Sequence, residues 1–222
     1  MKKERKESYR HVLPHYQQPG QVYFMTWCLK NAIPPKALAR YTQQLDKMQS
    51  QIETAKKLKK EGNVLENLKA EYFRVRKRYI LAYDQLLAQS LSGAINLMKA
   101  DVLKCIIETL CFWEGKQLTN YAFCVMPNHV HWVFSVFEKD EKGNPVYLQD
   151  IMQSVKRYSS NRINKLTGHA GPLWQKESFD TTIRDEKHLA NAIAYTLNNP
   201  VAAGFVTDWH EWPGCRNYNR RL

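Results

Sequence analysis

The sequence lacks long apolar runs and an apolar leader. No stretch of the 222 residues approaches the roughly 18 consecutive apolar residues of a membrane-spanning helix. Met1 is followed by KKERKESYRH, which contains no apolar core of a signal peptide. We therefore expect a cytoplasmic protein without a membrane partner.

Cysteines are few, and their spacing suggests no pairing. None of the five forms a CxxC motif, and their number is odd. These features exclude a disulfide framework and a zinc ribbon. We expect reduced and mostly buried thiols at Cys28, Cys105, Cys111, Cys124 and Cys215.

Acidic residues are in deficit, because 33 Lys and Arg face 21 Asp and Glu, a net charge of +12. With 12% aromatic residues the chain does not have the composition of a disordered tail, and a chain of this length buries roughly 70% of its extended surface. A folded and strongly basic protein favours a polyanionic partner, above all nucleic acid.

Two hydrophobic patterns alternate outside residues 40–90. Runs rich in aromatic and β-branched residues predict strands, whereas apolar residues at helical spacing predict helices. The predicted strands cover 21–29, 118–126, 129–137 and 178–183, and the predicted helices cover 95–112, 147–166 and 186–199. Pro200 should end the last helix. This order is typical of an α+β fold of ferredoxin-like type, an antiparallel sheet with helices on one face.

The segment 41–89 differs in composition, being rich in Lys, Glu, Gln, Leu and Ala. Apolar residues recur every three or four positions on both sides of a break at Gly62–Asn63: Leu45, Met48, Ile52 and Ala55, then Leu65, Leu68, Tyr72, Val75, Tyr79, Ala82 and Leu86. Two such seams joined by a short turn predict an inserted antiparallel helical hairpin. With 11 basic and six acidic residues in 40–90, it is either an arm that grips DNA or dimerises, or a solvated coiled coil.

His129 and His131 lie one residue apart in an apolar strand. Side chains alternate along a strand, so both imidazoles project to the same face. Such a pair meets a metal, pairs with acids or stays hydrated. The run MPNHVH, in which a tight turn delivers both imidazoles, favours the metal.

The last predicted helix carries a second candidate. At about 100° per residue, one stripe is apolar: Leu189, Ala190, Ile193, Ala194 and Leu197. The opposite side holds His188, Tyr195 and Asn199. Since Tyr195 and Asn199 are four residues apart, they lie one turn apart on one face. They are either surface residues or a phenol beside an amide that can hold a metal.

Together these motifs resemble the single-tyrosine HUH transposases, and among them the REP-associated tyrosine transposases of bacteria. The resemblance rests on YAFCVMPNHVH at 121–131 and YTLNNPVAAG at 195–204, with GPLWQ at 171–175 and residues 179–180 and 183–185 between them. It covers about residues 15–30 and 95–213 of the chain.

The resemblance implies metal-dependent cleavage and rejoining of single-stranded DNA at hairpins through a 5′-phosphotyrosine intermediate. It makes His129, His131 and Asn199 the ligands of Mg²⁺ or Mn²⁺, and Tyr195 the nucleophile. Neutral ligands leave the ion its full charge to polarise a phosphodiester. The sequence has no Walker motif, which agrees with rejoining without ATP because the phosphotyrosyl bond conserves the energy of the cleaved ester.

The same resemblance divides the chain. Residues 15–38 with 91–213 become the catalytic domain, 39–90 the inserted hairpin, 1–14 a basic flexible arm and 214–222 a basic tail. The protein is then a bacterial, nucleoid-associated enzyme. It is either a monomer or a homodimer formed through residues 41–89.

Single-stranded DNA is held by basic side chains and by aromatic faces that stack on bases. The candidates are Lys156, Arg157, Arg162, Lys165, Trp174, Arg184 and Arg216, with Arg220 and Arg221 in the tail. Tyr158 is a rival nucleophile. It has Arg162 instead of an amide four residues on, so we interpret it as a packing or DNA-contacting residue.

Two alternatives remain. One is a protein that binds nucleic-acid hairpins or single strands without catalysis, although the four intact site residues argue against decay. The other is a zinc hydrolase that uses the histidine pair with Cys124 or His188. It lacks a general-base carboxylate at a characteristic spacing, and strand alternation turns Cys124 away unless the hairpin turn resets it.

Overall fold

The computed structural model describes residues 8–10, 14–34, 36–37, 39–58, 62–89 and 95–218. Most of the predicted basic arm, together with Arg220 and Arg221, lies outside these described residues. Contacts divide the chain into two compact units, residues 1–30 with 92–222 and residues 31–91.

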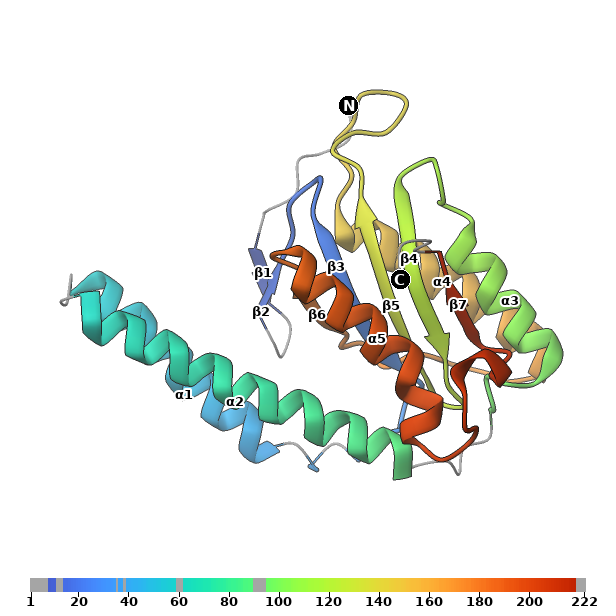
Figure 1. Ribbon diagram of the computed structural model, residues 1–222, viewed down its shortest axis with the longest axis horizontal. Coiled ribbons are helices and arrows are strands. Elements are labelled where there is room, and N and C mark those ends of the chain that lie inside the picture. Colours follow the sequence, from blue (N-terminus) through green and yellow to red (C-terminus); the bar gives the residue numbers. More distant parts are fainter. Residues whose placement is uncertain are drawn as a thin grey trace. The chain divides into compact units, whose positions relative to one another are not determined.

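The larger unit is built on a five-stranded antiparallel sheet with the strand order β6-β3-β5-β4-β7 (Figure 1). Its strands are β3 (Val22–Cys28), β4 (Leu118–Val125), β5 (His129–Val136), β6 (Phe179–Thr182) and β7 (Cys215–Asn217). A separate short ladder joins β1 (Ser8–Arg10) to β2 (Pro14–Tyr16). The antiparallel α+β fold is confirmed.

The helices of this unit are α3 (Ala100–Cys111), α4 (Leu148–Thr167) and α5 (Glu186–Ala202). The path β3-α3-β4-β5-α4-β6 in this strand order is the ferredoxin-like arrangement. As expected, α3 and α4 pack together on one face, but α5 covers the opposite face (Figure 1). The prediction of helices on one face is therefore wrong for α5. The reason is that β5 is buried on both faces, so each face needs a cover.

Strand β7 lies within the segment predicted to be a basic tail. It pairs with β4 and opposes Cys215 to Cys124. Three residues are too short for a recognisable alternating pattern, which explains why the strand was missed.

A β-bulge divides β4 between Asn120 and Ala122. Before the bulge the even-numbered residues share the face of Trp132, since the Asn120 Oδ1 accepts from the Trp132 indole. After the bulge the even-numbered residues Ala122 and Cys124 pack in the core under α5. One inserted residue thus reverses the facing of the strand.

Helix α5 continues past Pro200 to Ala202, so the prediction that Pro200 ends it is wrong. Proline removes one internal hydrogen bond, and this costs less near a helix end than in the middle. The helix stops at Gly204 (φ +73°), whose N–H donates to the Val201 carbonyl at 2.9 Å, while the Phe205 N–H donates to the Pro200 carbonyl at 3.0 Å. This is a Schellman motif, in which glycine takes the left-handed conformation.

The smaller unit contains α1 (Ala39–Lys57) and α2 (Gly62–Gln89), two helices joined by a short connection (Figure 1). The predicted α1 seam is buried throughout: Leu45, Met48, Ile52 and Ala55. The α2 seam is instead Tyr72, Val75, Tyr79, Tyr83 and Leu87. After Tyr79 the buried residues of α2 are spaced by four positions. The reason is that an α-helix has 3.6 residues per turn, so a strict heptad pattern drifts off the buried face.

No helix in the described part of the chain combines the length and the apolarity needed to cross a membrane.

Candidate active site

The two histidines of β5 lie side by side beneath α5. Their exposed fractions are 2% for His129 and 0% for His131. The Nε2 atoms are 3.0 Å apart, and the ring planes are nearly perpendicular at 86°. Strand alternation therefore does bring both imidazoles to one face, as predicted.

Each outer ring nitrogen is held by a neighbouring side chain. The His129 Nδ1 lies 2.6 Å from the Asn128 Oδ1, and the His131 Nδ1 lies 2.8 Å from the Thr26 hydroxyl. Thr26 and His131 are directly opposed on β3 and β5. Such outer contacts fix ring orientation and tautomer in metal-binding histidines. They leave the two Nε2 atoms facing each other.

Sequence reasoning missed these two supporting residues. Asn128 belongs to the predicted tight turn, and its place beside His129 also makes it a candidate hydrogen-bond partner. Thr26 is the hydroxyl within the otherwise apolar run of β3, and a buried hydroxyl needs a hydrogen-bond partner. The pairing of β3 with β5, which makes His131 that partner, is not visible in the sequence.

Burial keeps both rings neutral. Desolvation lowers the pKa of His129 well below its ordinary value, and the neighbouring His131 lowers it further. Desolvation also lowers the pKa of His131 to about 3, opposed by a hydrogen bond with the Asn199 side chain. Both imidazoles therefore offer lone pairs at neutral pH, which a metal ligand requires.

Helix α5 brings Tyr195 and Asn199 to the same place. The Tyr195 ring meets His131 edge to face with ring centroids 5.7 Å apart, and it meets Phe24 in the same way at 5.7 Å. The Asn199 Nδ2 donates to the Tyr195 carbonyl at 3.0 Å, and the amide also hydrogen-bonds to His131. The four predicted site residues are thus brought together.

The helical faces of α5 differ from the prediction. Ala192 and Thr196 are buried, whereas Ala194 is exposed. Tyr195 and Asn199 are half-buried, so they lie on the flank of the buried stripe and not on the side opposite to it. The alanines misled the prediction, because a short side chain fits a core and a surface equally well.

The donor set is suited to a divalent cation. It combines two neutral imidazoles with a neutral amide. Within the described ranges, no cluster of three His, Cys, Asp or Glu side chains could hold a metal ion. The Asn199 amide is the further neutral donor beside the histidine pair.

Part of the chain is similar to a known protein family. Residues 92–199 match the model of the family described as "Transposase IS200 like", a span that includes the histidine pair, Tyr195 and Asn199. This segment is similar to IS200-like transposases. The resemblance predicted from the motifs is confirmed.

Among individual proteins, a curated REP-associated tyrosine transposase of Haemophilus influenzae is 26% identical over 107 residues. That alignment covers 45% of this chain, and the chain spans about three fifths (59%) of the relative's length. A solved structure, a REP-associated tyrosine transposase bound to a REP hairpin, aligns over 93% of this chain and 80% of its own. Its sequence identity is 15%, and the TM-score is 0.46.

Cys124 lies on the histidine face of the sheet, because it directly opposes His131. Alternation alone would turn it away, but the hairpin turn between β4 and β5 sets the register that pairs Cys124 with His131, so the exception stated for this turn holds. Its thiol is buried in the core under α5 and donates to the Met126 Sδ at 3.6 Å. Burial raises its pKa well above the ordinary value, so it is kept as a neutral thiol. The His188 Nδ1, the other candidate zinc ligand, accepts a hydrogen bond from the Arg184 backbone N–H at 3.4 Å.

Two predicted DNA contacts are contradicted. Lys156 is half-buried, and its Nζ lies within hydrogen-bond distance of the Gln175, Lys176 and Glu177 carbonyls and of the Ser178 hydroxyl. Desolvation lowers its pKa to about 8. Its three N–H groups are thus engaged by the loop before β6. Trp174 is buried against Trp27, and its indole donates to the Ser159 hydroxyl at 2.9 Å.

The other predicted contacts are exposed and remain predictions. Three lie on α4, on the side of the sheet opposite to the histidines: Arg157, Arg162 and Lys165. Arg184 precedes α5, and Arg216 opposes Phe123 on β7 and donates to the carbonyls of Pro213 and Cys215. Tyr158 is exposed and borders a cavity of about 170 Å³ between α3 and α4. It is therefore far in the fold from the histidine face.

Proposed function

We propose that this protein cleaves and rejoins single-stranded DNA at hairpins through a 5′-phosphotyrosine at Tyr195. The observation that supports it best is the assembly of Tyr195 and Asn199 from α5 over the paired Nε2 atoms of His129 and His131. Two distant segments of the chain meet there, and no packing requirement explains a neutral histidine pair facing a half-buried phenol.

His129, His131 and Asn199 would hold Mg²⁺ or Mn²⁺. The fit is supported by the Nε2 separation of 3.0 Å, by the partners of both outer nitrogens and by the amide at His131. When bound, the ion supplies positive charge to a scissile phosphodiester. Asn128 and Thr26 keep the rings oriented for that purpose.

Tyr195 performs the bond exchange. Its phenolic oxygen bonds to phosphorus, the bond from phosphorus to the 3′ oxygen breaks, and the phenolic proton is lost while the departing 3′ oxygen gains one. The contacts of the Tyr195 ring with Phe24 and His131 orient the phenol before the substrate arrives. Reversal of the same exchange rejoins a strand.

The net charge of +12 supports DNA as the substrate. The exposed residues Arg157, Arg162, Lys165, Arg184 and Arg216 stay as candidate phosphate contacts. This function places the protein on DNA in the bacterial cytoplasm, as part of the nucleoid.

The decisive test is a denaturing gel that detects a covalent adduct between the full chain and hairpin-bearing single-stranded DNA with Mn²⁺ or Mg²⁺. We expect an adduct with the wild type and with Tyr158→Phe, and none with Tyr195→Phe. Loss of the adduct in Tyr158→Phe but not in Tyr195→Phe would refute the assignment. The absence of an adduct across varied hairpins would favour a non-catalytic binding protein.

The domain arrangement is part of the proposal. Residues 39–90 form an inserted unit outside the catalytic domain made of 15–38 and 91–213, and 41–89 are either an arm that grips DNA or dimerises, or a solvated coiled coil. Light scattering on the protein without residues 41–89 tests the dimerising role. If the oligomeric state is unchanged, residues 41–89 do not mediate dimerisation.

A further inference from the structure

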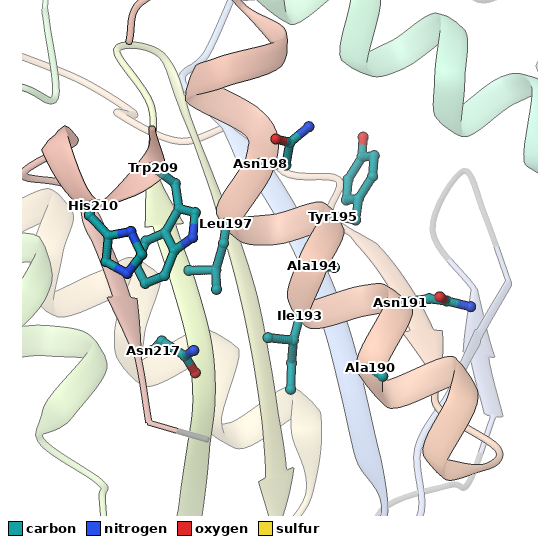
Figure 2. A pocket seen from close by; sticks show the side chains of 10 residues that line it. All are labelled: Ala190, Asn191, Ile193, Ala194, Tyr195, Leu197, Asn198, Trp209, His210 and Asn217. Atoms are coloured by element: carbon teal, nitrogen blue, oxygen red, sulfur yellow. The ribbon is translucent and has the colours of Figure 1, made fainter. Parts of the chain in front are cut away.

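A groove of about 860 Å³ lies between α5 and the segment that follows it (Figure 2). Its far wall comes from the short 3-10 helix η1 (Trp209–Glu211) and from Asn217 of β7. This volume falls in the range of roughly 300–1,000 Å³ typical of small-ligand sites. Tyr195 lines one end of the groove, and the function proposed above assigns no occupant to the rest of it.

A stacked aromatic pair forms the far wall. The rings of Trp209 and His210 lie with centroids 3.7 Å apart and planes 28° from parallel. The His210 Nδ1 is 2.7 Å from the Asp208 carboxylate, which also accepts from the His210 N–H at 3.0 Å. The indole of Trp212 donates to the Val125 carbonyl at 2.8 Å and fastens the segment to β4. The pair is therefore a fixed platform whose outer ring, His210, is exposed.

The exposed outer face of α5 at Ala194 and Asn198, here called the crest, lies between this platform and Tyr195. Figure 2 shows Tyr195 on one flank of the helix and the Trp209–His210 pair on the other. Ala194 and Asn198 are exposed on the crest between them and also line the groove. A methyl group and an amide leave this crest low and uncharged. A strand that passes Tyr195 can therefore cross α5 closely and reach the platform, about one helix diameter away, roughly 10 Å.

We infer that the groove holds an unpaired nucleobase of the strand whose phosphodiester Tyr195 attacks. The base stacks on the Trp209–His210 pair, and the amides of Asn198 and Asn217 lie within the same lining as hydrogen-bonding groups. This inference rests on the proposed function, and it adds where the flanking strand goes.

The chemistry of the lining favours a base over a peptide. Its side chains are apolar, aromatic or amide. Aromatic faces with amides are the usual means of holding unpaired bases, which stack irrespective of sequence. The groove and the crest of α5 beside it carry no positive charge of their own. The net charge of +12 of the whole chain supplies the general attraction for a DNA strand.

Binding in EDTA tests the inference separately from cleavage. The probe is a fluorescent DNA hairpin with ten thymidines on each side, compared with the same hairpin carrying abasic flanks. Loss of a stacked base should weaken wild-type binding roughly five- to one-hundred-fold. His210→Ala should reduce this ratio at least about threefold, since half of the platform is gone. Ala194→Glu should weaken binding of the thymidine probe by blocking the crest.

Ala100→Glu is the matched control, because it adds the same charge at an exposed helical position on α3. It should bind both probes like the wild type. The inference is overturned if His210→Ala keeps the full thymidine preference, if Ala194→Glu binds like Ala100→Glu, or if neither probe binds. If the preference behaves as expected but no adduct forms with a metal present, the groove assignment stands and the catalytic proposal fails.

Discussion

Strand β5 presents His129 and His131 to one face of the sheet, and Trp132 and Phe134 to the other. On the aromatic face, Trp132 stacks on Phe134 with centroids 3.8 Å apart and meets Trp27 edge to face. On the histidine face, the neighbours are Thr26, Phe24 and the half-buried Tyr195. One face is filled by large apolar rings, and the other keeps buried polar groups that packing alone does not require.

The difference between the two faces shows that side-chain alternation along β5 serves both stability and the candidate site. Burial of large aromatic rings supplies most of the stabilisation in such a layer. Buried imidazoles are tolerated only because each has hydrogen-bonding partners. Substitutions on the two faces should therefore separate stability from activity.

The largest effect is expected on the aromatic face, from Trp132→Ala. Trp132 is fully buried, and its removal leaves a cavity and takes from the Asn120 Oδ1 the indole N–H that it accepts. We expect a loss of about 3–5 kcal/mol in the free energy of unfolding, measured by urea denaturation. Trp132→Phe, which keeps a ring, should recover part of it. A loss no larger than that of a surface variant would contradict this division of the faces.

On the histidine face, His131→Ala should act on activity first. The protein loses one nitrogen of the candidate metal site and the contact with Asn199. The yield of covalent adduct should fall at least about a hundredfold, while the melting temperature falls less than in Trp132→Ala. A variant that unfolds as readily as Trp132→Ala would show that the histidine face is also structural.

Thr26→Val tests the support of the site at constant shape. Valine keeps the volume of threonine but cannot hydrogen-bond to the His131 Nδ1. Loss of such an outer partner typically costs about 10–100-fold in metal affinity or activity. Mn²⁺ titration of the wild type and the variant measures it. Thr26→Ser, which restores the hydroxyl, should recover the affinity, and failure to do so would assign the effect to packing.

The smallest effect is a pH dependence of stability in metal-free protein. Because burial lowers the pKa of His129 and His131 below 6.5, their contribution is complete above pH 6.5 and is lost as the pH falls toward 3. At pH 5.5 we expect a loss of about 1 kcal/mol per histidine relative to pH 7.5. Urea denaturation of the wild type and of His129→Asn/His131→Gln at both pH values measures it. An equal slope in the double variant would refute the assignment to these rings.

Much of this comparison was predictable from residues. Alternation was enough to place both histidines on one face, and helical periodicity was enough to put Tyr195 and Asn199 one turn apart. Periodicity failed where side-chain size is uninformative, as at Ala192 and Ala194, and where a proline lies close to a helix end, as at Pro200.

Other features depend on pairing between distant segments. The contact of Thr26 with His131 requires the register of β3 on β5, and the hydrogen bonds of Lys156 require the loop of residues 175–178 to close over it. Trp174 was a candidate DNA contact because tryptophan suits both a stacking surface and a core. Only the fold distinguishes these uses.

The β-bulge at Tyr121 has a consequence for how this chain tolerates length changes. Side-chain parity in β4 is set by a single extra residue, with Leu118 and Asn120 counted one way and Ala122 and Cys124 the other. Loss of the extra residue would leave Asn120 followed directly by Ala122, so both would keep their partners Phe134 and Val133 and the strand would alternate regularly. A one-residue deletion here therefore only removes the bulge, whereas a deletion within the regular pairing of β3 with β5 would exchange the two faces of the strand beyond it.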